Sequence, residues 1–308
     1  MPRIPRMVVT DPGQKAAYHV ISRTALDGLP FKQVEKDELV RTIRRFSAVY
    51  AVDVVGYAIM GSHFHLLVVV MPGEMVSDEE VRRRFLLLYG EGAAFPEARL
   101  SEYRERFSSL SAYIKDIKQT FSNFYNKRKK RKGTLWGERF KSVIVQQGNA
   151  LTNCLAYVDL NAVRAGIVKR PEEYRWCSIG YRIQTGNKDG FLSAELGTPE
   201  FGGADPARML GDYREFLYHV GAIEKKGKAK ISQKILDKET ATGFNLPQKE
   251  RFRYRSRYFT DSGIIGSRAF VETTYGTFRD RLQMRRDKIP EAIEGIDGMY
   301  SLKRLVDA

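Results

Sequence analysis

Two apolar segments joined by a two-residue turn place the strongest constraint on the fold. Residues 51–60 (AVDVVGYAIM) and 63–70 (HFHLLVVV) are rich in β-branched residues, and the Gly-Ser pair between them is a turn signal. The pair predicts a β-hairpin, whose strands are antiparallel neighbours in a sheet. Residues 54–73 carry no charge over a membrane-spanning length, but two histidines, three glycines and the alternation argue against a transmembrane segment.

The segments around this hairpin predict an α+β fold. The expected elements are a strand at 18–23, a helix at 36–49, a helix opened by a capping box at Ser77–Glu80, a helix at 110–127, a strand at 138–147, and a helix at 150–164 with Asn149 as N-cap and Gly166 past its end. The order β-α-β-β-α-α-β-α suits a ferredoxin-like sandwich, with an antiparallel sheet and helices on one side.

A stretch rich in glycine and polar residues divides the sequence. We expect a domain at 1–185, a linker at 186–205 and a smaller, mostly helical, basic C-terminal region at 206–308. Within that region we expect a helix at 207–221, a Lys-rich connection at 224–238 and a helical pattern over the last forty residues.

The charge balance indicates a polyanionic partner. The 308 residues hold 52 Lys and Arg against 37 Asp and Glu, a net charge of +15, which favours nucleic acid. The two cysteines, Cys154 and Cys177, form no CxxC pair, so disulfide scaffolds, zinc fingers and iron–sulfur clusters are not expected. The first residues lack a signal-peptide apolar core and no basic amphipathic anchor helix stands out, so a cytoplasmic protein without membrane attachment is expected.

The sharpest local feature is the histidine pair in the second strand of the hairpin. His63 and His65 are two residues apart, so on a strand both imidazoles project from one face while Phe64 enters the other. Two such imidazoles can hold one divalent cation. A bare pair is more often two exposed or core histidines, but these are two of only four in the chain. With no Cys or further His partner evident, a cation would complete its shell with amide or carboxylate oxygen, water and phosphate.

A tyrosine and an asparagine one helical turn apart form the second candidate. Tyr157 and Asn161 are i and i+4 on the predicted helix and share a face. Alone, they read as a Tyr at a helix–sheet boundary and an Asn near a helix end. With the two imidazoles they supply a nucleophile and ligands for metal-assisted attack on a phosphodiester.

Two basic segments interleaved with aromatic residues are candidates for nucleic-acid contacts. Residues 127–141 (KRKKRKGTLWGERFK) combine six consecutive cations with Trp136, Arg139 and Phe140, a mixture that suits phosphate contacts and base stacking. Residues 251–259 (RFRYRSRYF) would place four arginines on one face of a strand and three aromatic residues on the other. A solvated charged face and a strand packing on its own domain are the respective alternatives.

Together these residues resemble the single-tyrosine transposases of the HUH superfamily, and among them the REP-associated tyrosine transposases. The resemblance rests on YHVISR, IMGSHFHLLV, GTLWGERFKS, YVDLNAVRAGIV with PEEYRWCSIGY, and RYFTDSGIIGSRAFVE. It covers residues 10–185 and, less closely, 250–275. One departure is Ala162, because members usually read NPVRAG, and the missing proline could shift the end of that helix.

The resemblance implies a role for each matched residue. Tyr157 matches the nucleophile, and His63, His65 and Asn161 match the groups that hold a divalent cation, Mg²⁺ or Mn²⁺. Tyr125 is a rival nucleophile in a motif that does not match. Residues expected to hold the DNA are Lys127, Arg128, Lys129, Lys130, Arg131, Lys132, Trp136, Arg139, Lys141 and Arg164.

The implied activity is cleavage and rejoining of single-stranded DNA through a 5′-phosphotyrosine, at hairpin sites. The expected partner is single-stranded or hairpin DNA in a bacterial nucleoid, and the protein would be a monomer or homodimer. A non-catalytic hairpin-binding protein on the same fold is the main alternative. A plasmid replication initiator or relaxase is a further one, although those enzymes usually carry helicase or primase regions for which 308 residues leave little room.

Overall fold

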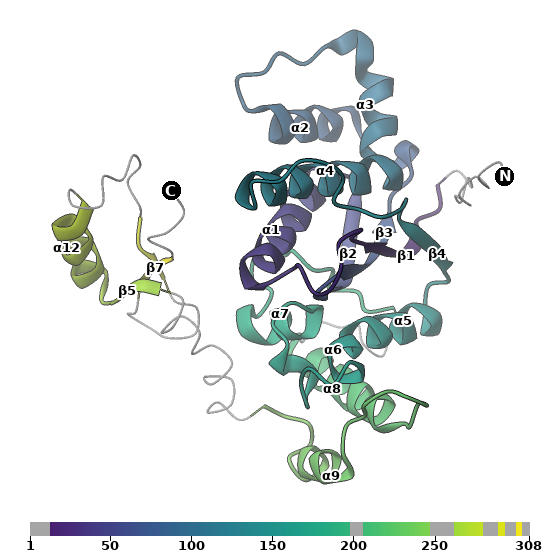
Figure 1. Ribbon diagram of the computed structural model, residues 1–308. Coiled ribbons are helices and arrows are strands. Elements are labelled where there is room, and N and C mark those ends of the chain that lie inside the picture. The colour runs from purple at the N-terminus through teal and green to yellow at the C-terminus, as the bar shows by residue number, and fades with distance from the viewer. Residues whose placement is uncertain (1–12, 198–205, 247–261, 280–288, 293–299, 304–308) are drawn as a thin grey trace. The chain divides into compact units, whose positions relative to one another are not determined.

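The computed structural model describes residues 13–197, 206–246, 262–279, 289–292 and 300–303 (Figure 1). The chain forms two compact units. The first comprises Met1–Arg182 with Asn187–Asn245, and the second comprises Ile183–Gly186 with Leu246–Ala308. No helix in the described ranges is both long and apolar enough to cross a membrane.

A four-stranded antiparallel sheet forms the centre of the first unit. Its strands are β1 (Ala16–Arg23), β2 (Val52–Ile59), β3 (His63–Val70) and β4 (Lys141–Val145), in the order β2-β3-β1-β4. This is the strand order of a ferredoxin-like sandwich, so the predicted α+β class and the predicted hairpin are confirmed. The hairpin's second strand has the predicted bounds, because its run of apolar and β-branched residues and the turn before it are both local signals.

Helices cover both faces of this sheet, not one side as expected. On one face α1 (Gln33–Val49) and α4 (Leu110–Arg128) pack together, with α2 (Asp78–Tyr89) and α3 (Leu100–Phe107) beyond them (Figure 1). Ser77 caps α2, as the capping box predicted. On this face the sheet buries alternate residues such as Val20, Phe64 and Leu66 in the main core. The opposite face carries α5 (Asn149–Asp159), which packs on β2, β3 and β4.

The helix that carries the candidate tyrosine begins and ends differently from the prediction. Gly148, with φ +83°, precedes α5, and Asn149 is its first residue, so the predicted Asn149 N-cap is wrong. The predicted helix at 150–164 is divided at Leu160, and a short second helix, α6 (Asn161–Arg164), follows. Gly166 lies past its end at φ +69°, as predicted.

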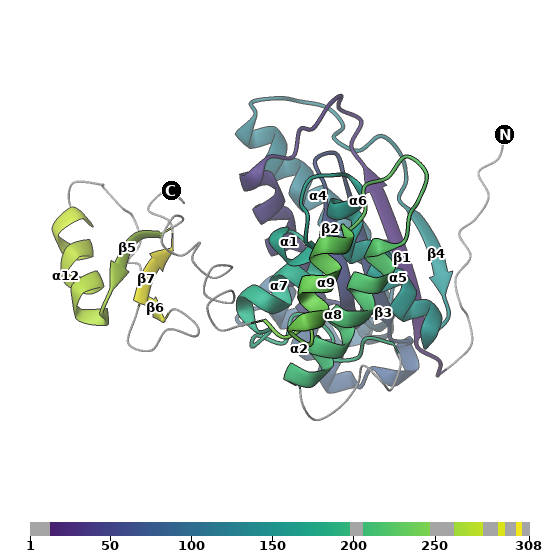
Figure 2. The same ribbon diagram turned by 90° about the horizontal axis from the view of Figure 1, so that it is seen from below.

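Part of the predicted linker and of the predicted C-terminal region pack in the first unit. Leu192 is buried and bridges to β2, where the Ser193 N–H donates to the Val54 carbonyl. After α7 (Ser178–Thr185), the helices α8 (Pro206–Ala222) and α9 (Gln233–Ala241) join the side of the unit that holds α5, as Figure 2 shows. Buried polar groups hold them there, because Tyr213 and Arg214 of α8 bond to Asp159 and Glu172.

The described part of the last forty residues includes strands as well as a helix, where a helical pattern was expected. The strands β5 (Ser262–Gly266), β6 (Glu291–Ala292) and β7 (Tyr300–Lys303) form a sheet in the order β5-β7-β6. Helix α12 (Arg268–Arg279) packs on β5 and β7. Residues 251–259, the second basic and aromatic segment, lie outside the described residues.

Candidate active site

Three imidazoles gather on the sheet face that α5 covers. The register pairs Ile21 with His65 and Arg23 with His63, so odd-numbered residues of β1 and β3 share one face, and His19 joins them there. The rings of His19 and His65 stack at 5.2 Å, with His19 Nε2 3.0 Å from His65 Nδ1. The rings of His63 and His65 are 5.2 Å apart and nearly perpendicular.

A glycine and a buried carboxylate place α5 against this face. A Cβ at Gly56 of β2 would meet Leu155 Cδ1 at 2.2 Å, so the Leu155 side chain of α5 occupies the space that this glycine leaves open. Near the end of α5, Asp159 is 1% exposed and accepts hydrogen bonds from Ser178 Oγ, the Ile179 N–H and the Tyr213 hydroxyl. Burial raises the pKa of Asp159 to about 6, an increase that these hydrogen bonds oppose.

The Tyr157 side chain lies over the stacked imidazoles. Its ring centroid is 5.7 Å from that of His19 and 5.7 Å from that of His65, edge-on to both. Tyr157 is nevertheless 49% exposed, so the residue is not enclosed by the core. The rival Tyr125 is buried among Phe31 and Phe121 in the main core, which makes it unavailable for attack on DNA.

Asn161 begins the short helix after the break at Leu160. Its amide Nδ2 donates to the Tyr157 carbonyl at 3.1 Å, which keeps the two residues on one side and leaves Oδ1 as an acceptor. The break occurs without the proline that related motifs carry, and Tyr157 and Asn161 still face one cavity. That cavity has a volume of about 630 Å³, and its lining includes His63, His65, Tyr157 and Asn161.

The imidazoles are held neutral by their surroundings. Burial, followed by the charge of Arg23, lowers the pKa of His63 to about 4. Burial, followed by His19, His63 and Arg23, lowers the pKa of His65 to about 3, and burial lowers that of His19 to about 4. Neutral imidazole is the form that binds a cation.

The hydrogen bonds of the imidazoles fit a cation site. If the His65 Nδ1–H donates to His19 Nε2, and the His63 Nδ1–H donates to Ser62 Oγ at 3.2 Å, both Nε2 lone pairs are left for a ligand. Ser62 Oγ also accepts from Arg23 at 3.1 Å. No group of three His, Cys, Asp or Glu in the described ranges has the arrangement of a metal site, so the donor set here is two imidazoles with an amide oxygen.

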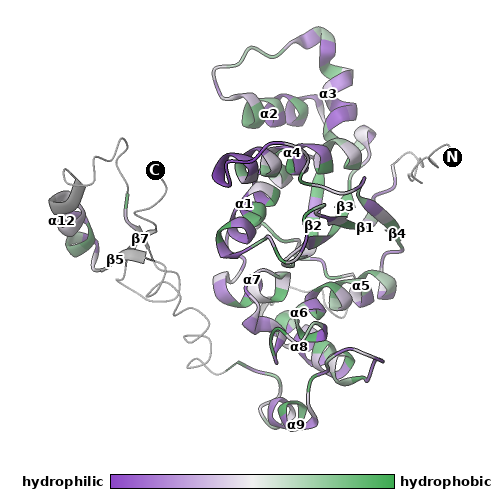
Figure 3. Cartoon of the chain, viewed as in Figure 1, coloured by the Kyte–Doolittle hydropathy of each residue, from purple (hydrophilic) through white to green (hydrophobic). Residues whose placement is uncertain are grey.

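The basic run after α4 has structural partners and lies apart from this cavity. Lys129 and Arg128 contact the buried carboxylate of Glu35 at 2.8 and 3.4 Å, and Arg131 donates to Asn126 Oδ1 and the Thr134 carbonyl. Figure 3 shows that one end of α4 is hydrophilic, and Lys127 lies in the last turn of the helix. Lys130 and Lys132 follow that end in the sequence. These six residues remain predicted DNA contacts, on the helix layer across the sheet from α5.

The other predicted DNA contacts differ in how exposed their side chains are. Trp136 is 8% exposed, its indole donates to the Lys118 carbonyl, and its ring packs on Phe31, Phe64 and Phe121, so it stacks in the core and not on bases. Arg139 and Lys141 are exposed, and Lys141 pairs with Ile21 in the register, on the histidine face.

Arg164 is committed to the protein backbone. Its guanidinium donates to the carbonyls of Val220, Ile223 and Ala229, and the Ala229 N–H donates back to the Arg164 carbonyl. This residue therefore fixes a loop at the rim of the cavity.

Sequence reasoning missed His19, Lys225 and Lys228. His19 lies between Tyr18 and Val20 in the first strand, so its side chain points to the opposite face from theirs. Only the β1–β3 register shows that this face brings its ring beside His65. Lys225 and Lys228 line the same cavity as Tyr157 although they lie more than sixty residues away in the sequence. Only the docking of α8 brings them there.

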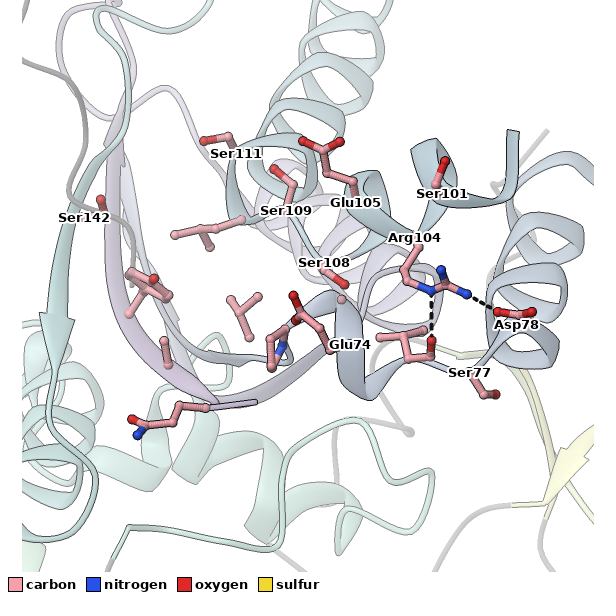
Figure 4. Close-up of a pocket in the computed structure, with 18 residues that line it drawn as sticks. Glu74, Ser77, Asp78, Ser101, Arg104, Glu105, Ser108, Ser109, Ser111 and Ser142 are labelled. Atoms are coloured by element: carbon pink, nitrogen blue, oxygen red, sulfur yellow. Dashed lines mark hydrogen bonds and ion pairs between the residues drawn. The ribbon is translucent and has the colours of Figure 1, made fainter. Parts of the chain in front are cut away.

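A second cavity, of about 790 Å³, opens on the opposite face of the sheet (Figure 4). It lies between β1 and the α3–α4 junction and is rich in serine, while Arg104 pairs with Asp78 and donates to the Val76 carbonyl. None of the sequence-predicted site residues that the structure describes lines it. It is larger than the Tyr157 cavity, and neither Tyr157 nor any histidine lines it.

Comparisons with known proteins found similar solved structures. A REP-associated tyrosine transposase bound to a REP hairpin has a TM-score of 0.41 and 12% identity, over 64% of this chain and 93% of that one. A candidate transposase from Deinococcus radiodurans has a TM-score of 0.27 and 15% identity, over 47% of this chain and 86% of that one. No family model and no curated protein matches the sequence.

Proposed function

We propose that this protein cuts and rejoins single-stranded DNA at hairpin sites through a covalent bond to Tyr157. The observation that carries the proposal is the half-exposed phenol edge-on to two stacked imidazoles, in a cavity shared with Asn161 and His63. A nucleophile, neutral imidazoles and an amide oxygen around one space are a set of groups that can support metal-assisted phosphodiester transfer.

The proposed step exchanges one phosphate ester for another. The Tyr157 oxygen attacks the phosphorus and the bond from phosphorus to the 3′ oxygen breaks. The phenolic proton leaves to water, and the departing 3′ oxygen takes a proton from water. The products are a strand with a free 3′-hydroxyl and a 5′-phosphate joined to Tyr157. Because the ester bond is conserved, a second 3′-hydroxyl can reverse the step without ATP.

The protein's own groups would prepare this attack. His63 and His65, neutral through burial, and Asn161 Oδ1 would hold a divalent cation, Mn²⁺ or Mg²⁺, with water and phosphate oxygens completing its shell. The ion would supply positive charge where negative charge builds on the phosphate. His19 fixes the ring of His65, and the Asp159 hydrogen bonds fix the helix end that carries Tyr157.

A polarity-resolved adduct assay tests the proposal. Oligonucleotides with a fixed stem-loop and randomised single-stranded flanks are incubated with the protein and Mn²⁺, and products are separated in SDS. Because the 5′-phosphate is retained, a 3′ label should appear on the protein and a 5′ label should not, and EDTA should abolish the adduct.

Two tyrosine variants control this assay. Tyr157→Phe should form no adduct, whereas Tyr125→Phe, which also removes one phenolic oxygen, should form as much as the wild type. An adduct of equal yield with Tyr157→Phe would show that another residue is the nucleophile. Metal-independent binding without any adduct would instead identify a non-catalytic hairpin-binding protein.

A further inference from the structure

A lysine-rich loop between α8 and α9 borders the Tyr157 cavity. We call residues 223–230 (IEKKGKAK) the lysine loop. Its Lys225 and Lys228 line the cavity together with Tyr157, His63 and Asn161. Lys230 pairs with Glu224 at 2.9 Å, which neutralises the one acidic residue of the loop. The loop therefore brings two cations to the space where the nucleophile lies.

The loop is folded against the site by named contacts. Arg164 donates to the carbonyls at Val220, Ile223 and Ala229, which brackets both ends of the loop. Inside it, the Lys228 N–H donates to the Lys225 carbonyl at 3.0 Å, in a turn that Gly227 permits with φ +69°. The lysines are therefore presented from a fixed backbone.

The base of the loop also packs on the helix break beside Tyr157. A Cβ at Gly221 would meet Ile231 at 2.5 Å and Leu160 Cδ2 at 3.0 Å, so α8 approaches the break closely. Leu160 is the residue that separates the helix of Tyr157 from the helix of Asn161. This close contact and the Arg164 hydrogen bonds couple the position of the lysine loop to that of the candidate site.

The electrostatics of this cavity suit phosphate. Its described lining contains Arg23, Arg164, Lys225 and Lys228 and no Asp or Glu. Arg164 bonds to carbonyls and Arg23 to Ser62, whereas Lys225 and Lys228 are exposed and pair with no carboxylate of the described chain. Ammonium groups in such a concave site bind a polyanionic backbone without regard to its sequence.

We infer that Lys225 and Lys228 bind backbone phosphates of the single strand entering the Tyr157 cavity, and that Arg164 is a positioning residue for the loop. This inference rests on the proposed function, because it takes single-stranded DNA as the ligand of that site. The predicted run at 127–132 would hold another part of the same DNA, from the opposite layer of the unit.

Binding in a Tyr157→Phe background tests the inference without cleavage. The double variant Lys225→Ala/Lys228→Ala is compared with Lys226→Ala/Lys234→Ala, which removes the same charge from exposed lysines that do not line the cavity. Fluorescence anisotropy with a tailed hairpin is measured across a salt series. Loss of two single-strand phosphate contacts should reduce the slope of log K against log salt by about 1.4.

The control and the DNA define the outcomes. On the tailed hairpin, the slope of log K against log salt should fall more in Lys225→Ala/Lys228→Ala than in Lys226→Ala/Lys234→Ala. On a hairpin without a tail, the slopes of the two double variants should be equal. Equal slopes on the tailed hairpin would overturn the inference. The proposed cleavage can fail separately. If only Lys225→Ala/Lys228→Ala lowers the salt slope but the wild type forms no covalent adduct, the lysine loop still binds single-stranded DNA and the proposed cleavage is overturned.

Discussion

His19 and His65 are hydrogen-bonded ring to ring across neighbouring strands, with His19 Nε2 3.0 Å from His65 Nδ1 and the two rings 13° from parallel. Both rings are buried and neutral, so a single proton occupies the bond between them. When that proton is on His65 Nδ1, the His65 Nε2 lone pair is available to a cation. The tautomer of His65 is thereby tied to a residue that does not line the cavity.

We expect His19→Ala to weaken Mn²⁺ binding by about 10- to 100-fold, the usual effect of removing the partner that orients a ligating imidazole. His219→Ala, in α8 beside Phe244, is the matched control and should leave the affinity unchanged. Electron paramagnetic resonance titration of free Mn²⁺ measures both. Nitrogen-15 chemical shifts should show a protonated Nδ1 on His65, and a protonated Nε2 there would contradict the model of the site.

The same imidazoles predict a loss of stability in mild acid. Their pKa values are lowered to about 4 for His19 and about 3 for His65, against about 6.5 in an unfolded chain. Between about pH 6.5 and 4 the unfolded chain takes up protons that the folded chain does not, so the free energy of unfolding falls as the pH falls. Asp159, with its pKa raised to about 6, contributes the opposite slope from about pH 6 down to its unfolded pKa near 4.

The contribution of one imidazole can be isolated by difference. His19→Gln should reduce the slope of unfolding free energy against pH by up to about 1.4 kcal/mol per pH unit between pH 6 and 5. Urea denaturation at three pH values measures it. An unchanged slope would mean that His19 is protonated in the folded protein.

Arg164→Ala should release the lysine loop while leaving the rest of the unit folded. The variant removes donors to the carbonyls at Val220, Ile223 and Ala229, so amide hydrogen exchange should rise across the lysine loop and stay unchanged in β1–β3. Arg164→Lys should not restore protection, because one ammonium group cannot reproduce a planar fork on three carbonyls. Protection equal to the wild type in either variant would show that other contacts hold the loop.

A buried ion pair should make α8 sensitive to loss of one arginine. Arg214 contacts Glu172 at 2.6 Å and Glu239 at 2.9 Å, and Glu239 also contacts Arg170. Arg214→Met leaves Glu172 buried without its cation, so we expect about 3–5 kcal/mol of destabilisation in chemical denaturation. Arg208→Ala, from an exposed pair with Asp212 on the same helix, should cost less than about 1 kcal/mol. Similar costs for the two variants would contradict this account.

Local patterns in the sequence were enough for the elements that carry the predicted chemistry. The β-branched run that follows the Gly-Ser turn predicted the bounds of β3, and the two-residue spacing predicted the shared face of His63 and His65, because side chains of a strand alternate whatever it packs against. The spacing of Tyr157 and Asn161 likewise predicted that they lie on one side, and both line one cavity although the helix breaks at Leu160, which the sequence did not predict.

Tertiary structure decided which other residues belong to the site. The register of β1 and β3 places His19 beside His65. The docking of α8 places Lys225 in the cavity that Tyr157 lines. Trp136 packs in the core, because burying a large apolar ring is favourable. Arg164 donates hydrogen bonds to backbone carbonyls. Such pairings depend on contacts between residues far apart in the chain, and those contacts exist only once the sheet and its two helical layers have packed.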